Sequence, residues 1–246
     1  MQKMIAIITA RGGSKRIPRK NIRDFYGKPM LHYAASACKE SGIFSEIMVS
    51  TDCGEIAAIA QNCGVSVPFL RSPKTSDDFA TTYDVLAEVI ANYKNNGKEF
   101  DYVCCVYPCV PFLSGDTLQK AYTQLIASNN DALQPVCKFP TPIEWAMNIE
   151  NGILVPNDRK AQLIRSQDLM PKYFDAGMFY MIRTAALLKE KSLTPPKTLA
   201  FIMDEKEVQD IDTEEDWAMA ELKYKLRHLQ NSSFESATAK KCSFAG

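Results

Sequence analysis

Short apolar runs that alternate with segments of helical periodicity are the feature that most narrows the fold of this chain. The first run, Met4-Ile5-Ala6-Ile7-Ile8, contains no polar residue, as expected for a strand buried on both faces of a parallel sheet. Further strands are predicted at 46–50, 67–70, 102–107, 132–137, 178–182 and 199–203, and helices at 30–39, 55–63, 81–95, 114–128, 185–191 and 214–227. This alternation predicts a Rossmann-like three-layer α/β fold with a mostly parallel sheet, which binds ligands at the carboxyl ends of its strands.

One segment, residues 140–172, interrupts the alternation. It contains Asn151-Gly152, a strong signal for a two-residue hairpin turn. We predict an inserted hairpin arm that contacts a second subunit, and a plain surface hairpin is the alternative. Residues 1–230 are predicted to form one domain that includes this insert. Residues 231–246 are small and polar, and are predicted to form a disordered tail.

Composition excludes several classes of partner. The formal net charge is +0, so nothing global favours a nucleic-acid or membrane partner. No apolar run approaches the roughly 20 residues that span a bilayer, and the short N-terminal run does not fit a signal peptide, so a cytoplasmic protein is expected. The eight cysteines contain no C-x-x-C pair and predict buried free thiols instead of a zinc site. The chain has 2 histidines, neither placed as a catalytic base would be.

A glycine-rich basic loop follows the first strand directly. It carries five cations, which are Arg11, Lys15, Arg16, Arg19 and Lys20, around the pair Gly12-Gly13. Glycines let the backbone turn its N–H groups toward an anion, and the cations neutralise a polyphosphate. The spacing is neither a Walker A motif nor G-x-G-x-x-G. The loop therefore predicts a phosphate site of another kind, with a merely solvated basic loop as the alternative.

An acidic pair near the C-terminus is the candidate metal site. Asp210 and Asp212 are separated by one residue, so an extended backbone points both carboxylates to one side. Mg²⁺ commonly takes one or two carboxylates together with phosphate oxygens and water. The alternative is an acidic helix N-terminus, which the helix dipole favours by itself.

The segment Ala10-Arg11-Gly12-Gly13-Ser14-Lys15, followed by Lys20-Asn21, resembles the signature of cytidylyltransferases that make CMP-sugars from nonulosonic acids. The CMP-sialic acid synthetases are the best known of these enzymes. The resemblance implies a nucleotidyltransferase fold in which Ala10 to Lys15 bind the nucleotide, Arg11 and Lys15 hold the triphosphate, and Lys20 and Asn21 lie nearby. It also implies that Asp210 and Asp212 bind Mg²⁺, because D-I-D-T-E stands at the matching place.

A second resemblance concerns the base. Phe69-Leu70-Arg71-Ser72-Pro73, with Ser76-Asp77-Asp78 after it, resembles the R-P-x-x-x-x-S-D segment of the family. It implies that Arg71 reaches the cytosine carbonyl and that a hydroxyl of Thr81 or Thr82 contacts the base or ribose. The alternative for Arg71 is a surface arginine.

Three further segments of the sequence bear on the sugar substrate. Tyr107 stands where many CMP-sialate synthetases have glutamine, which departs from the family pattern. R-S-Q-D at 165–168 and D-A-G-M-F-Y at 175–180 resemble the pseudaminic acid branch. That resemblance implies that Tyr107, Arg165, Gln167, Asp175 and Phe179 bind the sugar, although Phe179 and Tyr180 also fit core positions in a strand.

Together these resemblances imply transfer of CMP from CTP to the anomeric hydroxyl of pseudaminic acid, with release of pyrophosphate. Arg11 and Lys15 would stabilise phosphate charge, and Asp212 or a water on the metal would help deprotonate the hydroxyl. A homodimer and a product used for flagellin or surface glycans are implied as well. The alternatives are CMP-neuraminate, CMP-legionaminate or CMP-Kdo synthesis and, from another class, a nucleotide-binding module without catalysis.

Overall fold

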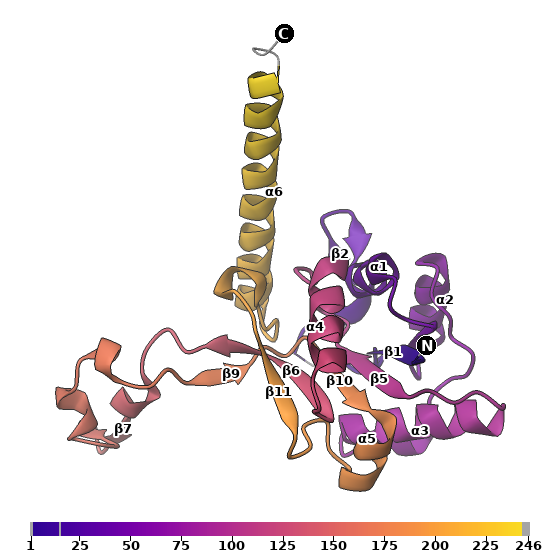
Figure 1. The fold of residues 1–246 in the computed structure, drawn as a ribbon, viewed down its shortest axis with the longest axis horizontal. Helices are drawn as coiled ribbons and strands as arrows, with labels where there is room; N and C mark the ends of the chain where they lie inside the picture. The colour runs from indigo at the N-terminus through magenta and orange to yellow at the C-terminus, as the bar shows by residue number, and fades with distance from the viewer. Residues whose placement is uncertain (1, 15, 243–246) are drawn as a thin grey trace.

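The computed structural model describes residues 2–14 and 16–242, and a seven-stranded mixed sheet forms its centre (Figure 1). The strand order is β11-β6-β10-β5-β1-β4, with β9 paired to β6. The strands are β1 (Met4–Thr9), β4 (Glu46–Ser50), β5 (Tyr102–Val106), β6 (Ala132–Lys138), β9 (Tyr173–Asp175), β10 (Phe179–Arg183) and β11 (Thr198–Ile202). Strands β4, β1, β5, β6 and β11 run in one direction and β9 and β10 in the other. The predicted α/β fold with a mostly parallel sheet is confirmed.

Helices cover both faces of this sheet, which explains the uninterrupted apolar sequence of β1. The helices are α1 (Leu31–Ser41), α2 (Gly54–Asn62), α3 (Thr82–Asn95), α4 (Gly115–Ala127), α5 (Thr184–Glu190) and α6 (Glu214–Cys242). Met4, Ala6 and Ile8 pack with residues of α1, α2 and α4. Ile5 and Ile7 point the other way and pack with residues of α3 and α5. Successive residues of a strand face opposite sides, so both sets must be apolar.

Two elements differ from the sequence prediction. The segment 67–70 forms no strand, because only one isolated bridge, between Met48 and Ser66, joins this region to β4. Helix α6 was predicted to end near Arg227, but it continues to Cys242 through most of the segment predicted as a disordered tail. The division of the chain into one domain and a tail stays a prediction.

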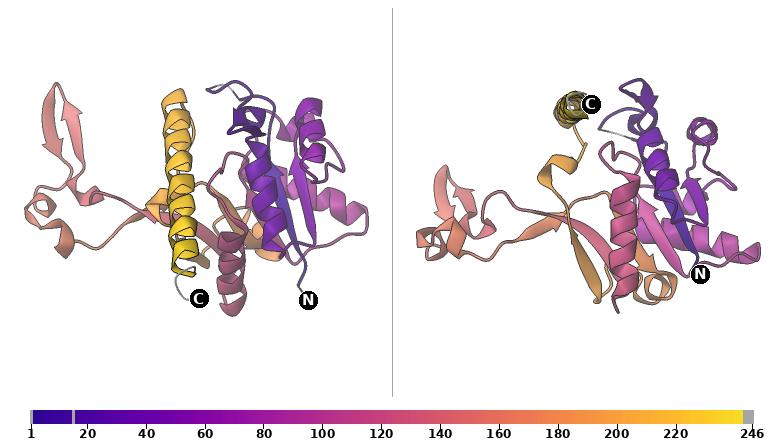
Figure 2. Two further views of the ribbon diagram at one scale, coloured as in Figure 1. Left: turned by 90° about the horizontal axis from the view of Figure 1, so that it is seen from above. Right: turned by 45° about the horizontal axis from the view of Figure 1, so that its top comes forward.

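The insert forms an arm that projects from the sheet beyond β6 and β9 (Figures 1 and 2). Its hairpin pairs β7 (Met147–Glu150) with β8 (Ile153–Pro156). Asn151 (φ 50°) and Gly152 (φ 81°) make the turn, and both have the positive φ that a two-residue type I′ turn requires. The predicted hairpin is therefore confirmed. Short 3-10 turns η3 (Ile143–Trp145), η4 (Ala161–Leu163) and η5 (Ser166–Asp168) complete the arm.

A third core cluster lies outside the two layers and joins the basic loop to the C-terminal helix. Its buried members are Ile17, Phe25, Met30, Phe112, Ile211, Trp217 and Ala220. The loop between β1 and α1 contributes η1 (Lys20–Ile22) and the two-stranded ribbon of β2 (Asp24–Phe25) and β3 (Lys28–Pro29). Turns η2 (Pro73–Thr75) and η6 (Glu205–Glu207) lie before α3 and α6. None of the described helices combines the length and apolar composition that crossing a bilayer requires.

Candidate active site

A cavity of about 460 Å³ opens where the chain leaves the carboxyl ends of β1 and β5. Parallel sheets place ligands at this edge. Its lining comes from four stretches of sequence, namely the end of β1 with the basic loop, the segment after β5, Gly177 before β10 and the acidic segment before α6. The lining residues are Thr9, Arg11, Ser14, Arg16, Ile17, Lys20, Asn21, Tyr107, Pro108, Cys109, Gly177, Gln209, Asp210, Ile211 and Asp212.

The third core cluster brings these distant stretches together. Ile17 of the basic loop and Ile211 of the acidic segment are both buried in it, at 1% and 2% exposure. Because the side chain of Ile211 points into the cluster, Asp210 and Asp212 on either side of it line the cavity. The prediction that the two carboxylates share one side is confirmed.

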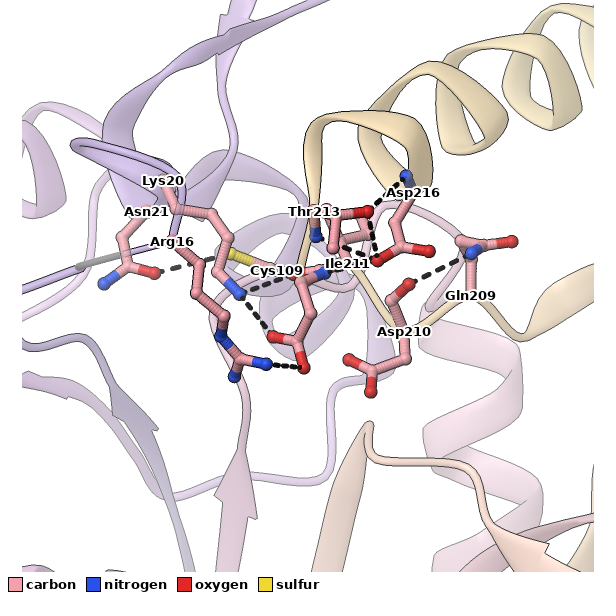
Figure 3. Close-up of polar contacts among 10 residues, drawn as sticks. Arg16, Lys20, Asn21, Cys109, Gln209, Asp210, Ile211, Thr213 and Asp216 are labelled. Carbon is pink, nitrogen blue, oxygen red and sulfur yellow. Dashed lines mark hydrogen bonds and ion pairs between the residues drawn. The ribbon is translucent and has the colours of Figure 1, made fainter. Parts of the chain in front are cut away.

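The basic loop contacts the acidic pair through two side chains (Figure 3). Arg16 Nη1 lies 2.7 Å from Asp212 Oδ2, and Lys20 Nζ lies 3.4 Å from Asp212 Oδ1. Lys20 also donates a hydrogen bond to the carbonyl of Ile211. The positive and negative halves of the site are therefore in direct contact.

Asp210 is in a different electrostatic position. Among the described residues no ion pair involves it, and Figure 3 shows its carboxylate pointing away from α6. Partial burial and the charge of Asp212 raise the pKa of Asp210. A cation between the two carboxylates would relieve both effects.

The donor set fits Mg²⁺ held jointly with a substrate. The described residues contain no group of three or more His, Cys, Asp or Glu side chains that could bind a metal alone. Two carboxylates beside a basic cavity are what Mg²⁺ needs when phosphate oxygens and water complete its octahedron.

Hydrogen bonds within the chain hold the basic loop in shape. Gly12 N donates to Asp52 Oδ1 at 2.8 Å, and Asn21 Nδ2 donates to the Arg11 carbonyl at 2.9 Å. Arg11 Nη1 lies 3.1 Å from Asp78 Oδ1. Gly12, Asn21 and Arg11, which are predicted to bind the nucleotide, therefore already have partners within the chain. A bound phosphate would share these groups with their present partners or displace them.

The remaining residues of the predicted nucleotide loop divide into three cases. Ser14 lines the cavity. Ala10 is buried and donates its N–H to the Ser50 carbonyl, and Gly13 lies outside the cavity lining. Lys15 lies outside the described residues.

The residues predicted to read the base do not line this cavity, although Thr82 hydrogen-bonds Tyr107, which does. Arg71 is partly buried, not a surface arginine: its Nε donates to Ser50 Oγ and its Nη2 to the Ser50 carbonyl, both at 2.9 Å. Burial lowers the pKa of its guanidinium. Thr81 caps α3 through a reciprocal pair of hydrogen bonds with Asp84, and Thr82 is the first residue of that helix. Their role in base recognition stays a prediction.

The predicted sugar residues are scattered. Tyr107 lines the cavity, and Asp175 is tied beside it, accepting hydrogen bonds from Gly177 N and the Tyr180 hydroxyl. The prediction that Phe179 binds the sugar is wrong, because its side chain is 0% exposed and lies in the main core. Strand β10 is paired along both edges, with β5 and β6, and its two faces pack into the two core clusters of the sheet.

Arg165 and Gln167 lie in the arm, and neither lines the cavity. Arg165 Nε instead lies 2.8 Å from Asp168 Oδ2 in the same turn. In a single chain these two residues are therefore not brought to the acidic pair.

Among the lining residues that were not named as site residues from the sequence are Arg16, Gln209 and Cys109. Arg16 stands in the basic run, but the family signature does not include it. Gln209 precedes the acidic pair directly, and its Nε2 donates to the Asp210 carbonyl at 3.0 Å. Cys109 Sγ lies 3.4 Å from Asn21 Oδ1, and burial raises the pKa of this thiol to about 12. For Cys109, the one signal in the sequence was its position shortly after a predicted strand.

Comparisons with known proteins address the family and the fold of this chain. Residues 5–237 match the family model described as "Cytidylyltransferase". The chain is 39% identical over 227 residues to pseudaminic acid cytidylyltransferase of Campylobacter jejuni, covering 92% of this chain and 98% of that protein. It is 30% identical to CMP-N,N'-diacetyllegionaminic acid synthase of Legionella pneumophila, covering 89% and 95%. A solved structure of CMP:2-keto-3-deoxy-manno-octonic acid synthetase complexed with CTP superposes with a TM-score of 0.63 at 16% identity, covering 92% of this chain and 99% of that one, so the two share a fold.

Proposed function

This chain belongs to the cytidylyltransferase family, and from that premise we propose that it transfers CMP from CTP to pseudaminic acid. The observation that carries the proposal is one cavity in which Arg11, Arg16 and Lys20 face the pair Asp210 and Asp212. Cations suit a triphosphate, and the carboxylates suit the metal ion that accompanies it. The 39% identity to a pseudaminic acid cytidylyltransferase supports the choice of sugar.

In the proposed reaction the anomeric oxygen attacks the α-phosphorus of CTP. The bond from that phosphorus to the bridging oxygen of the β-phosphate breaks, and pyrophosphate leaves with the electron pair. Arg11, Lys15 and Lys20 stabilise negative charge on the phosphates. The hydroxyl proton passes to Asp212 or to solvent.

We propose that Asp210 and Asp212 hold Mg²⁺. When bound, the ion neutralises phosphate charge and polarises the attacked phosphoryl group. Arg16 and Lys20 pair with Asp212 in the structure, and the triphosphate of CTP would offer these cations a second partner. As the triphosphate enters, the cations transfer to its oxygens and leave the Asp212 carboxylate available for metal.

We further propose that the enzyme is a cytoplasmic homodimer whose arm meets a second copy. The arm exposes large apolar side chains, including Ile149 at 75%, Ile153 at 67% and Leu163 at 88%. Ile149 and its cross-strand partner Leu154, which is 61% exposed, lie on one face of the hairpin. Exposed apolar surface of this kind marks interaction sites. If Arg165 and Gln167 bind the sugar, they do so in the cavity of the other copy, because they lie outside their own.

A pyrophosphate-release assay with CTP and a panel of nonulosonic acids tests the reaction. We expect turnover with pseudaminic acid that depends on Mg²⁺. Turnover restricted to legionaminic or neuraminic acid would show that the proposed sugar is wrong and that the cytidylyltransferase activity is right. CTP binding without turnover on any sugar would favour a nucleotide-binding module. Light scattering of wild type and of the variant Ile149→Glu/Leu154→Glu, which changes one cross-strand pair, tests the arm contact. We expect a dimer that the variant dissociates.

A further inference from the structure

A short chain of hydrogen-bonded side chains borders the cavity and ends at a carboxylate. Tyr107 follows β5 and lines the cavity, and Tyr180 lies in the neighbouring strand β10. Their rings pack edge to face with the centroids 5.6 Å apart, and a side-chain hydrogen bond links the two residues. The Tyr180 hydroxyl in turn donates to Asp175 Oδ2. A residue of the cavity lining is therefore connected to Asp175 through a buried tyrosine.

The register of the sheet brings these side chains together. Tyr180 and Cys105 are paired residues of β10 and β5, and paired residues place their side chains on the same face. Tyr107 follows Cys105 by two positions, so it lies on that face as well. Gly177 (φ 62°) turns the chain between β9 and β10, and its N–H donates to Asp175 Oδ1 at 2.9 Å. Because Gly177 also lines the cavity, the carboxylate end of the chain is held at the cavity edge.

The number of protons fixes the direction of these hydrogen bonds. Asp175 is exposed, so its carboxylate is ionised at neutral pH and only accepts. Burial raises the pKa of both Tyr107 and Tyr180, so each hydroxyl keeps its one proton at neutral pH. The proton of Tyr180 goes to Asp175, and the Tyr180 oxygen therefore accepts the proton of Tyr107. Tyr107 is left with acceptor capacity only.

An acceptor at this place discriminates between the ligand groups that could meet it. Phosphate oxygens are acceptors themselves, so the Tyr107 oxygen does not suit the triphosphate, which the basic loop attracts. The hydroxyl groups of a sugar are donors, and so is any amide N–H that the sugar carries. The Thr82 side chain also hydrogen-bonds Tyr107 and satisfies this acceptor in the absence of a ligand. The cavity therefore presents a neutral acceptor beside a charged phosphate site.

We propose that Asp175 and Tyr180 are positioning residues that hold the Tyr107 hydroxyl as a hydrogen-bond acceptor for a hydroxyl or amide N–H of the sugar. This inference rests on the proposed function, because the donor group belongs to the sugar of that reaction. Asp175 then acts through Tyr180 instead of contacting the sugar itself. Since the three side chains orient a binding group and not the attacked phosphorus, their loss should weaken sugar binding more than it slows transfer.

Tyr180→Phe tests the assignment, because it removes the hydroxyl and keeps the ring. With the sugar that wild type uses best, KM for the sugar should rise about five- to tenfold, while kcat and KM for CTP stay within about twofold, since one hydrogen bond is lost. Tyr107→Phe should give the same loss, and Tyr107→Phe/Tyr180→Phe no further loss, because the two hydroxyls act as a unit. An unchanged KM for the sugar, a rise in KM for CTP alone, or additive losses in the double variant would overturn the proposal.

Tyr102→Phe is the matched control. It removes a buried hydroxyl at the start of β5 for which no hydrogen-bond partner lies among the described residues, and it should change neither KM.

A measurement without turnover separates this inference from the proposed function. In protein that carries ζ-¹³C-labelled tyrosine, Tyr107→Phe identifies the Tyr107 resonance. Tyr180→Phe should shift that resonance, and Tyr102→Phe should not. An unmoved resonance in Tyr180→Phe would refute the hydrogen-bonded chain even in an active enzyme. A shifted resonance in a protein that turns over no sugar would refute the proposed function, and with it the sugar as the donor, while the chain of hydroxyls stands.

Discussion

Asp210→Asn removes one charge from the acidic pair while keeping the size of the side chain. Asp210 has no ion pair among the described residues, and burial together with Asp212 raises its pKa. The substitution leaves the contacts of Asp212 with Arg16 and Lys20 in place. We therefore expect a folded protein that is at least as stable as wild type and almost inactive.

The pH dependence gives the stability prediction a sign. The folded pKa of Asp210 lies above the usual 3.8, so between these two values the folded protein binds more protons than the unfolded chain. Wild type then loses stability as the pH rises through that window, and Asp210→Asn should not show this loss. Urea denaturation at a series of pH values measures the difference.

The catalytic effect is expected to be large. A metal ion contributes several kcal/mol of transition-state stabilisation, and each 1.4 kcal/mol is about tenfold in rate, so losing one of two protein ligands should lower kcat/KM roughly 100- to 1,000-fold. Pyrophosphate release is measured over a range of Mg²⁺ concentrations. Partial recovery at high Mg²⁺ is expected, because the ion is bound less tightly.

Asp216→Asn is the matched control. Its carboxylate accepts hydrogen bonds from Asp212 N at 3.0 Å and from Thr213 N at 2.9 Å at the start of α6, and it does not line the cavity. Weakening this cap should cost about 1 kcal/mol of stability with little effect on the Mg²⁺ dependence. If Asp210→Asn keeps kcat/KM within about threefold of wild type at every Mg²⁺ concentration, the acidic pair is not the metal site.

Three further substitutions or modifications test the packing. Phe179→Ala should lower the free energy of unfolding by about 3–5 kcal/mol in urea denaturation, because it empties a fully buried core position; a loss under about 1 kcal/mol would place the ring outside the core. Gly115→Ala should cost about 1–3 kcal/mol, since its added Cβ would lie 2.7 Å from the backbone of Glu40 and Ser41 in α1; unchanged thermal stability would contradict this close helix contact. Cys109 should react more slowly with iodoacetamide at pH 8 in the native protein than after unfolding, because its pKa is raised to about 12 and little thiolate is present; equal rates in peptide mapping would contradict the raised pKa.

The elements themselves were largely predictable from local sequence. The apolar run of β1 signalled a strand covered on both faces, and Asn151-Gly152 signalled the hairpin, because backbone conformation at these positions depends on neighbouring residues. Residues 67–70 have the composition of a strand but form none, since this segment pairs with the edge strand β4 only at Ser66, through one isolated bridge. Helix α6 ran past its predicted end because no glycine or proline stops it between Glu214 and Cys242.

In the candidate site, too, the local features were predictable from the sequence and the contacts between distant segments were not. The spacing of Asp210 and Asp212 by itself implied two carboxylates on one side, and the basic loop implied an anion site. Nothing in local sequence could show that Arg16 lies 2.7 Å from Asp212, since 196 residues separate them and the third core cluster joins their segments.

What the sequence determined by itself was therefore the local conformation and the chemistry of each segment. The tertiary structure decided which segments meet. It packed the face of β10 that carries Phe179 into the main core, and it placed Arg165 on the arm, outside the cavity lining. The physical reason is that strand order and core packing depend on contacts between residues far apart in the chain. The basic loop after β1 is an anion site by its own composition, but it faces two carboxylates only because Ile17 and Ile211 share one core.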